Sequence, residues 1–111
     1  MGCYADATAA KYGITRADQD AWALQSHERA IAAQQAGLFQ AEILSVTDSS
    51  GKTPRTIATD EAPRADSTIE ALAKLRPAFD TSGTGTAGNS SPLSDGAASV
   101  LVVDEARAKS G

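Results

Sequence analysis

The sequence contains one cysteine and one histidine, and this scarcity limits its chemistry. One cysteine cannot form an intramolecular disulfide, and one cysteine with one histidine cannot supply a structural zinc site. Cys3 has no histidine or carboxylate arranged near it in the sequence to activate a thiolate, so we expect a small buried thiol. His27 lies within a helical pattern and is expected to be structural. The sequence therefore predicts neither catalytic residues nor a metal site.

Long apolar runs and an excess of basic charge are also absent. A membrane-spanning helix needs about 18 or more apolar residues in a row, and the chain has no such run. Residues 1–6 show no basic region followed by an apolar stretch, so no secretory signal is predicted. Ten basic against 14 acidic side chains give a formal charge of −4, whereas nucleic-acid binding needs a clustered basic surface. We expect a soluble, cytoplasmic protein with neither nucleic-acid nor membrane partners.

Large apolar side chains are scarce as well. The chain has 111 residues, the length of one domain, and 23 of them are alanine. Leu, Ile, Val and Phe together number 18, below the roughly 20% expected of a globular domain. Alanine gains little from burial, because the gain is about 25 cal/mol per Å² of apolar surface. This thin core predicts a segment of a larger protein or an obligate oligomer.

Capping signals predict two helices near the N-terminus. Residues 4–13 form an alanine-rich helix that Gly13 ends, and Thr15 caps a longer helix that ends at Gly37. Apolar residues at helical spacing predict a narrow stripe that a neighbour would cover. The stripe consists of Ala17, Ala21, Leu24, Ile31 and Leu38. The acidic residues Asp18, Asp20, Asp60 and Glu61 are expected to cap helices or to be solvated.

The rest of the chain predicts short elements. Residues 42–46 and 55–59, with a polar turn between them, predict a β-hairpin. Residues 67–70 (STIE) match a capping box and predict a short helix that ends before Pro77. The apolar run 100–103 predicts a strand buried on both faces, and Asp104 and Glu105 then resemble the start of a helix.

Residues 83–88 (GTGTAG) match the spacing of a dinucleotide-binding fingerprint, with Asp104 and Glu105 roughly where a ribose-binding acid would follow. That mechanism needs a strand before the glycines and a long helix after them. Pro77 precedes the glycines, and only about two helical turns fit before the apolar run. A flexible loop of small residues is therefore favoured over a nucleotide site.

Seven blocks, in order over nearly the whole chain, carry a family resemblance. They are residues 1–2, 11–14, 16–20, 26–27, 37–43, 72–79 and 83–98. The last of them, GTGTAGNSSPLSDGAA, is the most specific. Together they resemble the middle of the thiolases, acyl-CoA C-acyltransferases that cleave or form 3-ketoacyl-CoA and that are usually dimers or tetramers.

The resemblance implies an α/β fold of two similar halves with an inserted loop domain over the active site. Residues 1–92 resemble that helix-rich, coenzyme A-binding loop domain with a short β-hairpin. Residues 93–111 resemble the last helix and strand segment of the N-terminal half, with one buried core strand. The family's nucleophilic cysteine would lie upstream, and its histidine and second cysteine downstream. Cys3 and His27 match neither role, so we expect the isolated chain to be inactive.

The resemblance also implies that coenzyme A or acyl-CoA is a substrate and that no cofactor is permanently bound. Arg64 matches the arginine that packs along the adenine. Ala87 and Ser91 match the loop that hydrogen-bonds the pantetheine amides, and Leu93 follows the same arm. An uncharged loop of small residues can approach so thin an arm closely, while a guanidinium stacks on the base.

At the acyl end of the pocket, Met1 and Phe79 match residues that form its walls. Two positions depart from the family pattern. Gly85 replaces the usual valine, so we expect the strand entering the loop to be looser. Ala71 stands where some members have a serine that contacts coenzyme A, so that contact is not expected here.

The expected partners are acyl-CoA, the rest of a thiolase chain and further copies of it. Two alternatives stay open: a free-standing, non-catalytic module that binds coenzyme A or oligomerises, and a helical interaction protein with an alanine-rich stripe. The segment does not distinguish a degradative from a biosynthetic parent, although residues 89–93 resemble the degradative type more.

Overall fold

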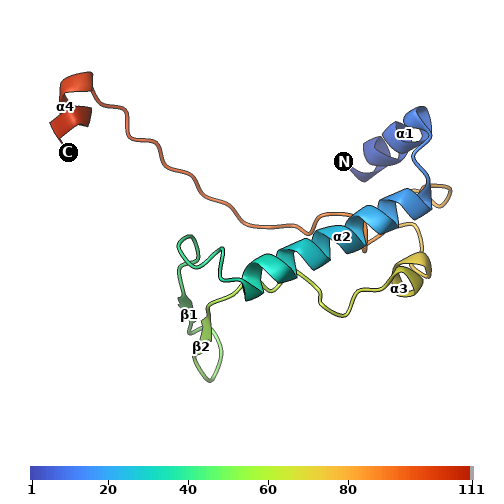
Figure 1. Cartoon of the computed structure of the whole chain (residues 1–111), viewed down its shortest axis with the longest axis horizontal. Helices are drawn as coiled ribbons and strands as arrows, with labels where there is room; N and C mark the ends of the chain where they lie inside the picture. Colours follow the sequence, from blue (N-terminus) through green and yellow to red (C-terminus); the bar gives the residue numbers. More distant parts are fainter. Residues whose placement is uncertain (111) are drawn as a thin grey trace.

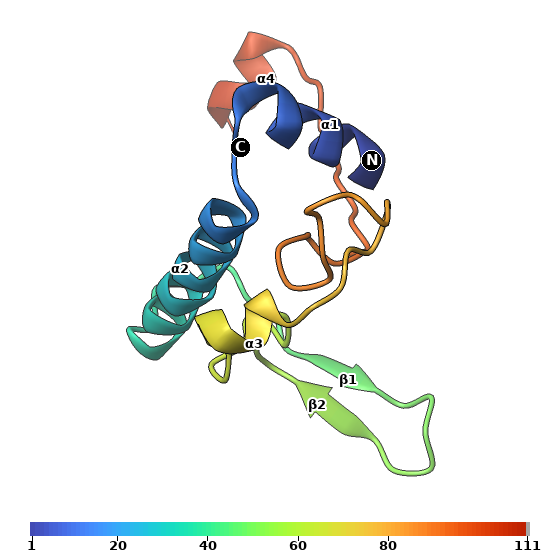
Figure 2. The ribbon, with the colours of Figure 1, turned by 90° about the vertical axis from the view of Figure 1, so that its right-hand side faces the viewer.

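The computed structural model describes residues 1–110. The elements are α1 (Gly2–Tyr12), α2 (Arg16–Gln35), β1 (Val46–Asp48), β2 (Arg55–Ile57), α3 (Ile69–Ala73) and α4 (Glu105–Ser110). Helix α2 forms the long axis of the body, with α1 near its start and the hairpin near its end (Figure 1). Helix α3 packs against α2, as the turned view also shows (Figure 2). An extended segment carries α4 away from this body (Figure 1).

The predicted ends of the first two helices and the Thr15 cap of the second are confirmed, whereas the first helix begins at Gly2, two residues earlier than predicted. Gly13 has φ 66°, a left-handed conformation that glycine adopts without steric cost, and it follows the last residue of α1. At the start of α2, the Asp18 amide donates to Thr15 Oγ1 at 3.1 Å, and the Thr15 amide donates to Asp18 Oδ2 at 3.0 Å. This reciprocal pair is a capping box, so Asp18 caps the helix as expected. Gly37, with φ 70°, follows its end.

The predicted hairpin is confirmed, with a later first strand. Strands β1 and β2 are antiparallel, and Val46 lies opposite Ile57. The turn begins at Asp48, whose Oδ1 accepts from the Ser50 amide at 2.9 Å. Residues 42–45 do not belong to β1, because the chain is still turning after α2: the Ile43 amide donates to the carbonyl of residue 39 at 3.0 Å.

Helix α3 begins one residue later than predicted. Its N-cap is Thr68, whose Oγ1 accepts from the Ala71 amide at 3.1 Å. With Thr68 as the N-cap, the third helical position is Ala71, which has no carboxylate to bond the N-cap amide. The capping box expected between Ser67 and Glu70 is therefore wrong. The helix ends before Pro77, as predicted.

The apolar core is as small as the composition predicts. Within residues 1–110, the buried apolar side chains are Ala9 and Leu72, and the buried polar ones are Asp20 and Thr86. The radius of gyration is 19.3 Å, whereas a compact domain of this length has about 13 Å. None of the helices in this range is long and apolar enough to cross a membrane. Most of the shape is therefore held by contacts other than apolar packing.

The predicted stripe on α2 is largely wrong. Ala17, Ala21 and Leu38 are exposed, and only Leu24 and Ile31 are half-buried. The one buried residue of the helix is instead polar: Asp20, which is only 3% exposed. The reason is that the loop opposite presents hydrogen-bonding groups, which an apolar stripe could not satisfy.

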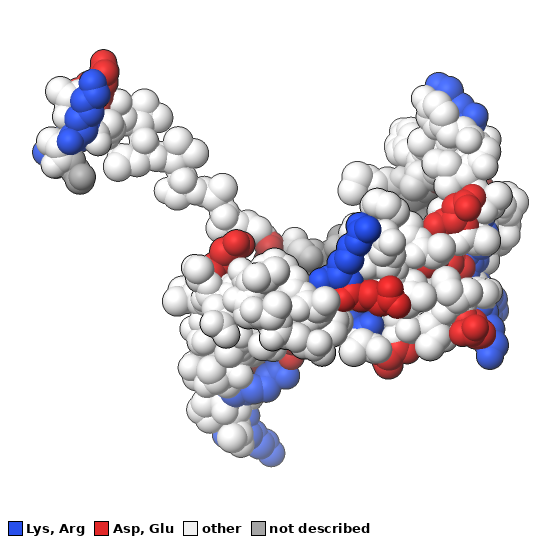
Figure 3. All heavy atoms as spheres, in the orientation of Figure 1, with Lys and Arg blue, Asp and Glu red and all other residues white. Residues whose placement is uncertain are grey.

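The predicted buried strand at 100–103 is also corrected. These residues are extended but unpaired, and Val100, Leu101 and Val102 are 85 to 88% exposed. A strand needs a partner backbone, and the sheet among residues 1–110 contains β1 and β2 alone. The segment projects from the body in the space-filling view (Figure 3). The helix expected after it is confirmed: Asp104 Oδ1 accepts from the Arg107 amide at 2.8 Å at the start of α4.

Candidate functional site

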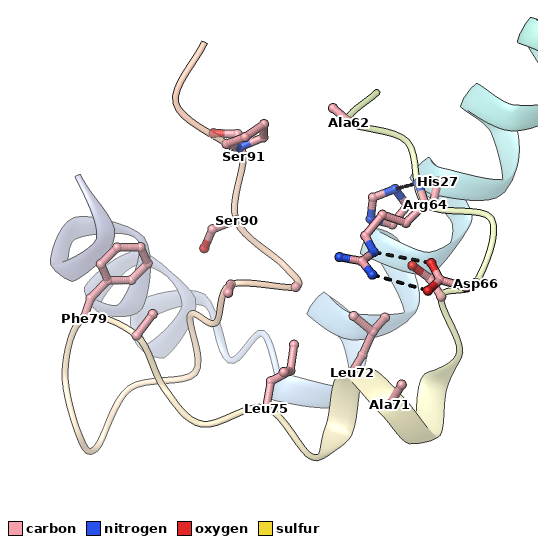
Figure 4. A pocket seen from close by; sticks show the side chains of 15 residues that line it. His27, Ala62, Arg64, Asp66, Ala71, Leu72, Leu75, Phe79, Ser90 and Ser91 are labelled. Atoms are coloured by element: carbon pink, nitrogen blue, oxygen red, sulfur yellow. Dashed lines mark hydrogen bonds and ion pairs between the residues drawn. The ribbon is translucent and has the colours of Figure 1, made fainter. Parts of the chain in front are cut away.

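A cleft of about 680 Å³ lies between α3, the segment before it and the loop after residue 86. Its size falls within the range of small-molecule sites. Leu72 and Leu75 form its floor, Arg64 stands on one side, and Ser90 and Ser91 stand on the other (Figure 4). An apolar floor between polar walls suits a long ligand with an apolar body and polar groups along it.

The cleft brings together four of the six residues that the sequence singled out. Arg64, Phe79, Ala87 and Ser91 all line it, although they are spread over 28 positions of the sequence. Phe79 lies at the opposite end of the cleft from Arg64 (Figure 4). Met1 and Leu93 are not among the lining residues, and both side chains are fully exposed. Ala71, one of the two departures from the family pattern, lines the cleft as well.

Arg64 is held at the rim by two neighbours. Its Nε and Nη2 each lie 3.3 Å from a carboxylate oxygen of Asp66 (Figure 4). Its backbone amide donates to His27 Nδ1 at 3.2 Å, which gives His27 the structural role expected of it. The hydrogen bond from Arg64 lowers the pKa of Asp66, and the charge of Arg64 lowers it further. The paired guanidinium keeps its flat faces free for stacking.

The loop of small residues is ordered by its own side chains. Thr86 is fully buried, and its Oγ1 accepts from the amides of Gly88 and Asn89 at 3.2 and 3.3 Å. In return, Asn89 Oδ1 accepts from the Thr86 amide at 2.7 Å. The chain forms no helix between Gly88 and α4, so the helix that a dinucleotide fingerprint needs directly after the glycines is not there. The loop predicted for residues 83–88 is therefore confirmed, but hydrogen bonds fix its shape.

Helix α2 holds this loop through Asp20, whose predicted role as a capping or solvated acid is wrong. Its Oδ2 accepts from Arg16 Nε at 2.8 Å, and its Oδ1 accepts from Asn89 Nδ2 at 3.0 Å. The spacing of Arg16 and Asp20, four apart on one helix, is a sequence signal for their ion pair. No local pattern indicates Asn89, which is 69 positions away.

Helix α1 holds the other end of the loop. Asp6 Oδ1 accepts from the amides of Thr84 and Gly85 at 2.8 and 2.7 Å. The Gly85 carbonyl accepts from the Ala78 amide at 2.8 Å, so both backbone polar groups of Gly85 are paired. These bonds offset the looseness expected from glycine at this position. Asp6 Oδ2 is buried and has no hydrogen-bond partner among residues 1–110.

Cys3 is exposed, whereas we expected it to be buried. Its thiol belongs to an exposed residue of α1, so the prediction of a buried cysteine is wrong. Ala9 is the one buried residue of α1, and only Gly2 and Asp6 are half-buried beside it. Cys3 does not line the cleft.

Comparison with known proteins gives matches over almost all of the chain. The family described as "Thiolase, N-terminal domain" matches residues 1–106. The acetyl-CoA acetyltransferase of Pseudomonas aeruginosa is 51% identical, over 98% of this chain and 28% of its own length. The peroxisomal 3-ketoacyl-CoA thiolase B of Rattus norvegicus is 45% identical, over 98% of this chain and 27% of its own. The chain thus spans little more than a quarter of the length of these relatives.

Solved structures give the same picture. The acetyl-CoA acetyltransferase of Bacillus anthracis matches with a TM-score of 0.76 and 43% identity, over 80% of this chain and 23% of that one. The acetyl-CoA acetyltransferase of Syntrophomonas wolfei matches with a TM-score of 0.70 and 44% identity, over 78% and 22%. Sequence and fold therefore agree on one family.

Proposed function

Since this chain belongs to the thiolase family, we propose that it is the coenzyme A-binding segment of an acyl-CoA C-acyltransferase. The observation that carries the proposal is the cleft, which gathers Arg64, Phe79, Ala87 and Ser91 around one elongated space. The relatives named as acetyl-CoA acetyltransferases support acyl-CoA as the substrate. No permanently bound cofactor is part of the proposal.

The contacts that we propose follow the length of the cleft. The Arg64 guanidinium packs along the adenine at the rim, where Asp66 holds it in place. The pantetheine arm lies over the floor leucines, with the backbone at Ala87 and the Ser91 hydroxyl bonded to its amides. Phe79 stands at the acyl end. Met1 and Leu93 do not line the cleft and are fully exposed, so we propose that they contact the ligand only outside it.

We propose that the rest of a thiolase completes this segment. Residues 1–92 act as the loop domain, and residues 93–111 belong to the N-terminal half. The exposed run 100–102 would then join the sheet of that half, which would cover its apolar side chains. The catalytic cysteines and histidine come from outside this segment, so the segment alone is inactive. A dimer or tetramer and a cytoplasmic location complete the proposal.

The test is coenzyme A binding by the full-length protein, measured by isothermal titration calorimetry. We expect Arg64→Ala with Ser91→Ala to abolish measurable binding. The matched control is Arg29→Ala with Ser49→Ala, because both residues are exposed and lie outside the cleft. Unchanged affinity in the Arg64 and Ser91 variant would overturn the site. Thiolysis of acetoacetyl-CoA by the same protein separates the enzyme from the alternative, a non-catalytic binding module.

A further inference from the structure

Three side chains beneath the cleft connect its floor to its far wall. Arg16 and Asp20 come from α2, and Asn89 comes from the loop. None of them lines the cleft. We propose that Arg16, Asp20 and Asn89 are positioning residues, which hold the two sides of the cleft at the spacing that coenzyme A requires. This inference rests on the proposed function.

Arg16 fixes the floor. Its Nη2 donates to the carbonyl of Leu72 at 2.7 Å and to that of Leu75 at 3.1 Å. The Leu72 carbonyl belongs to the last turn of α3 and also accepts from the Leu75 amide at 3.0 Å, and the Leu75 carbonyl lies just beyond the helix. The two leucine side chains form the cleft floor. The position of the floor relative to α2 therefore depends on one guanidinium, which Asp20 orients through Nε at 2.8 Å.

Asn89 fixes the far wall, and each of its side-chain groups is used. Its Nδ2 donates to Asp20 Oδ1 at 3.0 Å and to the Thr84 carbonyl at 3.1 Å. Its Oδ1 accepts from the Thr86 amide at 2.7 Å. The next two residues along the chain, 90 and 91, present their hydroxyls on the wall (Figure 4). The Asn89 amide therefore determines where that wall begins.

Asp20 joins the two sides, because one of its oxygens bonds the floor's guanidinium and the other bonds the wall's amide. The residue is 3% exposed, and hydrogen bonds to a buried carboxylate are short and strong. Because hydrogen bonds already order the loop, ligand binding does not have to restrict its conformation further, and this preorganisation favours binding. The network should consequently affect affinity for coenzyme A, and not the chemical step.

The test uses Asn89→Ala and Asp20→Asn in the full-length protein. We expect the dissociation constant for coenzyme A, and the KM of thiolysis, to rise about tenfold or more as charge-assisted hydrogen bonds are lost. We expect kcat at saturating coenzyme A to stay within about twofold. The matched control is Asp18→Asn, because Asp18 is on the same helix but its side chain bonds only Thr15 among residues 1–110. It should leave both constants unchanged, even if it lowers the melting temperature.

Two results would overturn the inference. One is an unchanged dissociation constant in either variant, provided that circular dichroism shows the variant folded. The other is a loss of kcat at constant KM. If Asn89→Ala does not fold, the nearly isosteric Asp20→Asn decides. Failure of the proposed function looks different, because then the wild-type protein binds no coenzyme A or the Arg64 and Ser91 variant binds it normally.

Discussion

Replacement of Gly88 by alanine would place a methyl group against both leucines of the cleft floor. A Cβ at this position would lie 2.5 Å from Leu72 Cδ2 and 2.6 Å from Leu75 Cδ1. Carbon atoms pack best at about 3.5 to 4.0 Å, so each leucine would have to retreat by about 1 Å. Gly88 does not have positive φ, so alanine fits its backbone and the effect is purely steric.

The two leucines differ in how easily they can move, and this sets the magnitude. Leu72 is 5% exposed and has little room to move, whereas Leu75 is 38% exposed and can rotate toward solvent. Overpacking a core costs about 1–3 kcal/mol, and one mobile neighbour places this case at about 1–2 kcal/mol. Because the methyl group also narrows the cleft, affinity for coenzyme A should fall together with stability.

Urea unfolding of the full-length protein measures the first effect, and calorimetric titration with coenzyme A measures the second. Gly51→Ala is the control, because Gly51 lies in the hairpin turn and its added Cβ would meet only the carbonyl of residue 53, at an ordinary 3.8 Å. A double-mutant cycle with Leu75→Ala should show favourable coupling, since the smaller side chain removes one of the two clashes. The steric argument is refuted if Gly88→Ala is as stable as the control, or if the cycle shows no coupling.

Two further predictions concern the helix end and the cleft rim. Gly13→Ala should destabilise the protein by about 1–2 kcal/mol, because φ is 66° and its Cβ would contact nothing that offsets the strain; an unchanged melting temperature would contradict this. Arg64 lowers the pKa of Asp66 in the folded state, below the value of about 3.9 for an unfolded aspartate. The stabilisation is therefore complete above about pH 4 and is lost as the pH falls through the lowered pKa. Asp66→Asn should remove this part of the acid sensitivity in unfolding measured from pH 7 to pH 3, and identical pH profiles would show that the pair contributes nothing.

Local signals predicted the local structure well. The cap at Thr15 and the glycine stop at Gly13 depend on groups at most five residues apart, so both are visible in the sequence, although the acid that completes the Thr15 box was not foreseen. The hairpin turn at Asp48 is equally local. The error at α3 was one residue, because Ser67 and Thr68 are adjacent hydroxyls and either can cap a helix. The choice between these two caps depends on how α3 packs against α2, which is a tertiary contact.

Only the family resemblance pointed to residues that share the cleft. No spacing rule connects Arg64 to Ser91, yet both line the same cleft. The residues beneath the cleft escaped prediction for a related reason. Helical periodicity counts apolar side chains, whereas the inward side of α2 carries Asp20, whose partner Asn89 is 69 positions away. The run 100–103 was misjudged because its burial depends on a partner strand that residues 1–110 do not supply.

The small apolar core gives the polar network a particular importance. Each hydrogen bond adds only about 1 kcal/mol to stability, but it has a direction, which apolar contact lacks. With Ala9 and Leu72 as the buried apolar side chains of residues 1–110, direction must come from polar groups. Asp6 and Asp20 tie α1 and α2 to opposite ends of one loop. Burial of the exposed apolar residues against the rest of a thiolase would supply stability, while these two carboxylates set the geometry. Loss of Asp20 should therefore weaken ligand binding more than it weakens the fold.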